Sequence, residues 1–128
     1  MGRIVTLVSI TNATNPDYFL RCDALVDTGA SYMFLPTAWK ERLGDLNLIR
    51  TVELQTSTQS TVNGEVYGPV QIKIDGFSPI YSEVVFVEMQ PEDGFYEPLI
   101  GYIILEQSQI AVDMVGHRLM PVKKMDFR

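Results

Sequence analysis

The segment Ala24-Leu25-Val26-Asp27-Thr28-Gly29-Ala30-Ser31 decides the fold, because it places a carboxylate directly after an apolar strand. A second apolar run, Met33-Phe34-Leu35, follows almost at once. A carboxylate between two segments that must be buried loses its hydration, so it is kept there only where amide donors satisfy it or chemistry requires it. One interpretation is a turn in which Asp27 caps its own loop. The apolar context favours the other interpretation, a functional carboxylate.

A second short motif, Leu99-Ile100-Gly101, comes much later in the chain and is also apolar before its glycine. The residues that follow, 102–108, predict a short helix. Taken alone, the motif is the end of a buried strand. A buried strand end is also compatible with a functional role.

Together, the two motifs in this order resemble those of the retropepsin-like aspartic proteases, of the bacterial, single-lobe, homodimeric type. The resemblance covers residues 4–114. It implies a mostly β fold, a retropepsin-like closed β-barrel with one lobe per chain, and a single domain over residues 1–128. It also implies a catalytic Asp27, an active-site loop of Thr28, Gly29, Ala30 and Ser31, and a supporting loop of Leu99, Ile100 and Gly101, whose glycine lets the chain cross closely.

The chemistry of this family needs two carboxylates. When the two carboxyl groups lie about 3 Å apart, they cannot be ionised at the same time, so they share one proton. The ionised group acts as base on a bound water, and the protonated group donates to the carbonyl oxygen of the substrate. The chain has one Asp-Thr-Gly and no Asp-Ser-Gly, so the second carboxylate must come from another copy across a two-fold interface. The resemblance further implies that the Thr28 hydroxyl bonds to the partner's equivalent loop and that Gly29 lets the two loops approach.

The sequence departs from the family at one ion pair. Retropepsins commonly carry arginine after the glycine of the second motif and aspartate two residues after the catalytic glycine. This chain has Tyr102 and Ser31 there. Both partners are absent together, so no lone charge is left, but the substrate contact that the acidic residue usually makes is missing.

A polar hairpin over residues 54–66, the flap hairpin, occupies the position of the family's substrate-covering flap. Its tip is expected at Thr56, Ser57, Thr58, Gln59 and Ser60. Threonine, serine and glutamine stand where a core strand would be apolar, which suits a lid over an extended substrate. A plain exposed hairpin is the alternative, and Asn63-Gly64 is an alternative turn. Unlike family flaps, this tip has no glycine.

The rest of the chain also predicts short strands and little helix. A helix is expected at 38–43, where Trp39 is a core residue and Gly44 the stop, and another at 102–108. The expected strands are 4–10, 18–26, 32–35, 52–57, 61–67, 70–74, 80–88, 110–114 and 117–122, with an acidic loop over 91–98.

Length and composition narrow the class of protein. A chain of 128 residues is the size of one domain. Its net charge of −6 repels phosphate backbones and anionic lipid, so neither a nucleic-acid partner nor a membrane is expected. Cys22 and His117 are each the only residue of their type, which leaves no disulfide and no ligand set for a metal, and no cofactor is expected. No signal peptide or long apolar stretch is recognised, so a cytoplasmic location is expected.

These observations predict a homodimeric aspartic endopeptidase, a hydrolase that cleaves peptide bonds in an extended peptide or protein substrate through water between Asp27 and the partner's Asp27. The alternative is a catalytically silent dimer of the same fold that binds peptides or serves as a dimerisation module. A third interpretation, an unrelated barrel for a small molecule, predicts a monomer.

Overall fold

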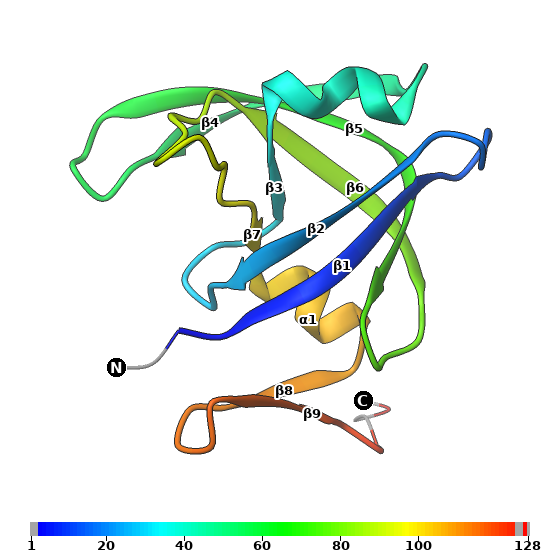
Figure 1. Ribbon diagram of the computed structural model, residues 1–128, viewed down its shortest axis with the longest axis vertical. Coiled ribbons are helices and arrows are strands. Elements are labelled where there is room, and N and C mark those ends of the chain that lie inside the picture. The colour runs from blue at the N-terminus through cyan, green and yellow to red at the C-terminus, as the bar shows by residue number, and fades with distance from the viewer. Residues whose placement is uncertain (1–2, 125–126, 128) are drawn as a thin grey trace.

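The computed structural model describes residues 3–124 and 127, which form a mostly β fold with a closed barrel (Figure 1). Six strands form the ring in the order β1-β2-β7-β3-β6-β5, which the pairing of β1 with β5 closes, and β4 extends the sheet beyond β5. The barrel expected from the sequence is confirmed. The elements are β1 Val5–Asn12, β2 Phe19–Val26, β3 Met33–Pro36, η1 Thr37–Leu43, β4 Asn47–Gln55, β5 Thr61–Ile74, β6 Ile80–Val87, β7 Leu99–Ile100, α1 Tyr102–Gln107, β8 Ile110–Asp113 and β9 Arg118–Pro121.

Alternating residues of the strands fill the barrel. Val8 and Ile10 of β1 are fully buried, and so are Ile72 and Ile74 of β5. Ile10 lies opposite Ile72 in the ladder that closes the ring. Because successive side chains of a strand point to opposite faces, this pattern places one face of each strand in the core. Ile104 of α1 joins the same cluster, which fixes the helix against the barrel.

Two short helical segments lie where the sequence predicts them. The first, η1, is a 3-10 helix and ends at Gly44, whose φ of 65° favours glycine. Trp39 is partly buried against the core and meets Tyr96 edge to face, with ring centroids 5.8 Å apart. Its predicted place in the core is therefore confirmed. Neither these segments nor any other helix of the described residues is long and apolar enough to cross a membrane.

Most strands lie within about two residues of the prediction, and β4 and β5 differ most from it. β4 begins at Asn47 rather than at residue 52, and its first five residues are all exposed. Exposed residues show no alternation of polar and apolar side chains, so the pattern that reveals a half-buried strand is missing there. β5 runs unbroken from Thr61 to Ile74, where two strands were predicted, although its register with β6 shifts between Tyr67 and Val70.

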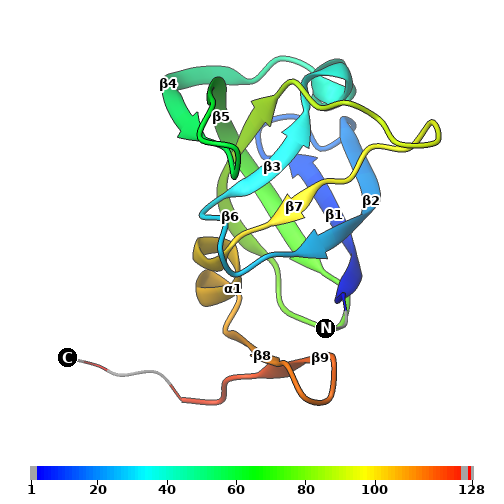
Figure 2. The ribbon, with the colours of Figure 1, turned by 90° about the vertical axis from the view of Figure 1, so that its left-hand side faces the viewer.

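The last two strands, β8 and β9, form a separate two-stranded sheet below the barrel (Figure 2). In the turn between them, Asp113 Oδ1 accepts hydrogen bonds from the N–H groups of Gly116 at 2.9 Å and Val115 at 3.1 Å. Arg118 Nε donates to Oδ2 at 3.1 Å. These bonds, with that from Gly116 first, hold the pKa of the Asp113 carboxyl below its ordinary value. The carboxylate therefore fixes the turn.

Cys22 of β2 is expected to react slowly with alkylating reagents. The thiol is partly buried against the core, and burial together with the nearby Asp23 charge raises its pKa to about 11. The thiolate is the reactive form, so iodoacetamide at pH 8 should modify Cys22 about a hundredfold more slowly than an ordinary thiol. Mass spectrometry of timed samples measures the rate. The chain unfolded in urea is the control and should react at the ordinary rate; equal rates in the folded and unfolded chain would contradict this pKa.

Candidate active site

Asp27 lies on the loop that follows β2, where the strand leaves the barrel. Its backbone N–H donates to the Ile100 carbonyl at 2.9 Å. Its side chain is half-buried, and Oδ1 accepts a hydrogen bond from Gly29 N–H at 2.9 Å. The Ala30 N–H donates to the Asp27 carbonyl at 3.1 Å and closes a turn. The loop thus holds the carboxylate with its own amide, and Thr28 and Gly29 are exposed at its tip.

The segment from β7 into α1 crosses directly behind this loop. Three backbone hydrogen bonds join the two, from the N–H groups of Gly101, Tyr102 and Ile103 to the carbonyls of Tyr32, Ala30 and Ser31, at 2.9, 2.9 and 3.0 Å. A Cβ at Gly101 would lie 2.6 Å from the carbonyl oxygens of both Ser31 and Tyr32. No side chain fits at that distance, so the crossing requires glycine. The structure therefore brings the predicted active-site loop and supporting loop into direct contact.

The two residues that depart from the family pattern lie at this crossing. Ser31 is partly buried, and Tyr102 is exposed at the start of α1. Their segments are joined through main-chain groups, because the Ser31 carbonyl accepts the hydrogen bond from Ile103 N–H. The backbone thus connects the loops without an ion pair between these positions.

The flap hairpin turns at the predicted tip. Thr56 N–H donates to the Ser60 carbonyl at 2.8 Å, and Gln59 N–H donates to the Thr56 carbonyl at 2.9 Å. Gln59 has a φ of 64°, the conformation that the missing glycine would adopt without strain. The other tip residues, Ser57 and Thr58, are exposed.

The alternative turn at Asn63-Gly64 is wrong. Asn63 and Gly64 lie within β5, opposite Glu53 and Val52 of β4. Gly64 is buried, and a Cβ there would lie 2.7 Å from Val85 Cγ1. This glycine therefore serves the packing of β5 on β6 rather than a turn.

A second apolar cluster, separate from the barrel core, lies between the Asp27 loop and the flap hairpin. Ala30 and Tyr32 contribute from the loop side, and Val52 and Leu54 contribute from β4. The buried members are Phe34, Val66, Val85 and Val87, and Met89 and Leu99 pack on the edge. This cluster was not predicted from the sequence. The signal was the unbroken apolar run in β6, because a strand with both faces covered loses its alternation.

The described residues contain no cluster of three or more histidine, cysteine, aspartate or glutamate side chains that could hold a metal ion.

Comparisons with known proteins agree with this fold. The chain is similar in structure to the EIAV protease, solved in complex with the inhibitor HBY-793, with a TM-score of 0.56 and 23% sequence identity over 82% of this chain and 86% of the other. At that identity the likeness concerns the fold. No curated protein sequence matches the chain. A family model described as aspartyl protease matches residues 15–102, which include both β2 with its Asp27 loop and the crossing at Gly101. Since this match covers more than half of the sequence, the chain belongs to the aspartyl protease family.

Proposed function

We propose that the protein is a homodimeric aspartic endopeptidase in which Asp27 and the partner's Asp27 form the catalytic pair. The observation that carries the proposal is the place of Asp27: a half-buried carboxylate on a short loop whose backbone is bonded to the segment crossing behind it. Such bonding holds a catalytic group in one orientation, which a general base needs. One chain supplies one such loop, so the reaction requires two chains.

The reaction follows from two carboxylates that share a proton. The ionised carboxylate removes a proton from a bound water, whose oxygen attacks the peptide carbonyl carbon, while the protonated carboxylate donates to the carbonyl oxygen. The tetrahedral intermediate then breaks its C–N bond: the carboxyl that took the water proton donates it to the amine nitrogen, and the other carboxylate takes back its proton from the hydroxyl as the new carboxylic acid forms. The Gly29 N–H, 2.9 Å from Asp27 Oδ1, holds this carboxylate in a fixed orientation.

The proposed substrate is an extended peptide with apolar side chains near the cleaved bond. The flap hairpin offers main-chain groups to a strand lying beneath it. Ala30, Tyr32, Val52 and Leu54 are only partly buried in the second cluster, so their outer surfaces can contact apolar side chains of the substrate. A cytoplasmic location is part of the proposal, since the chain's single cysteine suits a reducing compartment.

Hydrolysis in ¹⁸O-labelled water of a peptide mixture derived from denatured proteins tests this function. Water attack places one labelled oxygen in each new C-terminal carboxylate, which mass spectrometry detects, and apolar residues should be enriched beside the cleaved bonds. Peptides that bind without new termini would favour the silent, peptide-binding dimer instead. If the protein neither binds nor cleaves any peptide in the mixture, the proposal is overturned.

Specific activity is expected to fall on dilution. Each active site needs two chains, so below the dissociation constant of the dimer the activity per chain should drop roughly tenfold for each tenfold dilution. A dilution series with a cleavable peptide measures this, and sedimentation gives the mass at the same concentrations. Inert carrier protein controls for loss on surfaces. Constant specific activity in a sample of monomeric mass would exclude the shared site.

A further inference from the structure

The flap arm, β4, is the strand of the seven-stranded sheet that lies outside the closed ring. Among the described residues it pairs with β5 alone, and it lies outside the ring that β1 and β5 close. Residues 47–51, its first half, are exposed. A strand held by one ladder at the edge of a sheet opens more readily than a strand held on both sides. The position of the flap hairpin therefore depends on what else holds β4.

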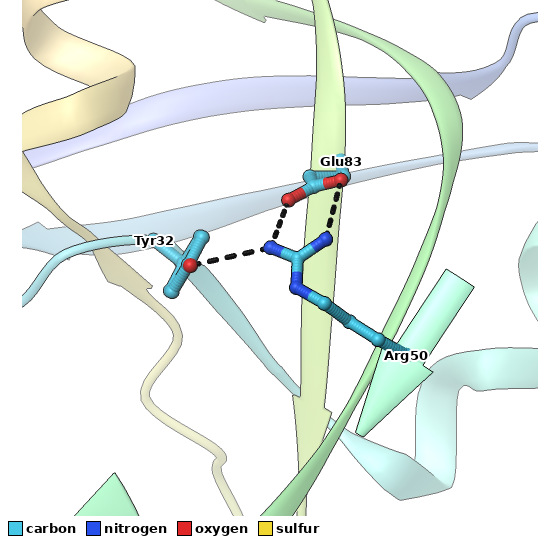
Figure 3. A network of polar contacts seen from close by, with 3 residues as sticks. All are labelled: Tyr32, Arg50 and Glu83. Atoms are coloured by element: carbon cyan, nitrogen blue, oxygen red, sulfur yellow. Dashed lines mark hydrogen bonds and ion pairs between the residues drawn. The ribbon is translucent and has the colours of Figure 1, made fainter. Parts of the chain in front are cut away.

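Arg50 connects β4 to two other parts of the barrel (Figure 3). Its guanidinium donates to both carboxylate oxygens of Glu83 on β6, at 2.5 and 3.3 Å, and Nη2 also donates to the Tyr32 hydroxyl at 3.2 Å. The register of β4 on β5 shifts between Leu48 and Arg50, and such a bulge changes the direction of the side chains beside it. The contact reaches across β5, which lies between β4 and β6 in the sheet.

Gly68 of β5 lies next to this contact. A Cβ at that position would lie 3.4 Å from both Glu83 Cβ and Ile49 Cδ1, so the glycine sits directly between the two strands that Arg50 joins. A hollow of about 570 Å³ borders the same place and is lined by Arg50, Glu83, Tyr32, Ile49 and Gly68, among others. A larger residue at position 68 would project its side chain into the space beside the Arg50–Glu83 contact.

We propose that Arg50, Glu83 and Tyr32 form a positioning clamp, which fixes the flap arm to the barrel and to the end of the Asp27 loop and so holds the flap hairpin ready to close on substrate. Its role in turnover rests on the proposed endopeptidase function. None of the three residues needs to touch the reacting atoms.

Several features distinguish the clamp from an ordinary surface ion pair, which contributes little. The guanidinium is bidentate, which fixes its orientation as well as its charge. The hydrogen bonds to Glu83 and then Tyr32 hold the pKa of Arg50 above its ordinary value. Tyr32 also meets Phe34 edge to face, with centroids 6.1 Å apart, and its carbonyl accepts the Gly101 N–H. The clamp thus ends on the residue that directly follows the predicted active-site loop.

Loss of the clamp should weaken substrate binding more than chemistry. If the flap arm holds its binding-competent position for a smaller fraction of the time, the apparent affinity for substrate falls in proportion to that population. Once the complex has closed, its two carboxylates are still in place, so the chemical step changes little. Arg50→Met and Glu83→Gln should therefore each raise KM about three- to tenfold and change kcat less than about twofold. The double variant should show no larger change than the greater of the two, because both remove one interaction.

Amide hydrogen exchange tests the clamp without any substrate. In Arg50→Met and in Glu83→Gln, amides of residues 54–62 should exchange about three- to tenfold faster than in the wild type, while those of β1 and β2 keep their rates. Arg118→Met is the matched control, since it removes another exposed arginine–carboxylate bridge, that to Asp113. It should leave KM and flap exchange unchanged.

The clamp proposal is overturned if the amides of residues 54–62 exchange at the wild-type rate in both Arg50→Met and Glu83→Gln. It is also overturned if Arg118→Met raises their exchange rate by the same factor. Additive effects on KM in the double variant would overturn it as well. If the wild type cleaves no peptide, the endopeptidase proposal fails, but the exchange measurement still decides whether the clamp holds the flap arm.

Discussion

Asp27→Asn is expected to abolish peptide hydrolysis while the protein still folds and dimerises. The amide cannot take a proton from water, and the activity should fall roughly a thousandfold or more. The fold should survive because Asn keeps the shape of the side chain and its carbonyl oxygen can accept the hydrogen bond that Gly29 N–H makes to Asp27 Oδ1. In the proposed dimer the substitution also replaces the two facing carboxyl groups, which cannot both ionise, by two neutral amides. Initial rates with a cleavable peptide and sedimentation of the same sample measure both effects.

Asp23→Asn is the matched control for this substitution. Asp23 is exposed on β2, four residues before Asp27, and loses the same charge by the same chemical change. It should keep close to full activity, so that a general effect of net charge is excluded. Near-normal turnover in Asp27→Asn would remove this carboxylate from the mechanism, and turnover lost in both variants would point to the charge of the surface rather than to catalysis.

Where a strand has one buried face, its sequence predicts it well. Val8 and Ile10 alternate with Ser9 and Thr11, and the structure buries both apolar residues. The start of β4 could not be predicted in this way, because Asn47 to Thr51 have no buried face and therefore no pattern. The turn signal at Asn63-Gly64 was misleading for a related reason. A glycine in a sequence is compatible with either a turn or a close packing contact, and Gly64 is buried against Val85.

In the candidate site, too, the short continuous motifs could be predicted from the sequence, whereas the contact between distant segments could not. The loop at Asp27 and the motif at Gly101 are each a short continuous stretch of sequence, so the two could be matched to a family, and that resemblance implied that they pack together. The clamp of Arg50, Glu83 and Tyr32 joins three separate segments, and its geometry depends on a shift of register in β4. A single sequence does not reveal such a shift, since Arg50 and Glu83 each look like ordinary exposed charges.

Gly101→Ala is expected to destabilise the protein strongly. The new Cβ would lie 2.6 Å from the carbonyl oxygens of Ser31 and Tyr32, and both belong to backbone that cannot swing aside as a flexible side chain can. Relief requires the two segments to separate, which stretches the hydrogen bonds from Gly101 and Tyr102 to Tyr32 and Ala30. Overpacking at such a contact, together with weakened buried hydrogen bonds, should cost about 3 kcal/mol or more. Urea and thermal unfolding followed by circular dichroism measure the loss, expected to be at least about 10 °C in Tm.

Gly76→Ala separates crowding from backbone strain. Gly76 has a φ of 89° and no heavy atom within 4 Å of the added Cβ, so alanine there has open space and bears only the strain of its conformation, about 1 kcal/mol. If Gly101→Ala unfolds within about a degree of Gly76→Ala, the close crossing is not what requires glycine at position 101. If it is far less stable, as expected, the same contact explains why Asp27 is held so firmly, because the Ile100 carbonyl that accepts the Asp27 N–H directly precedes Gly101.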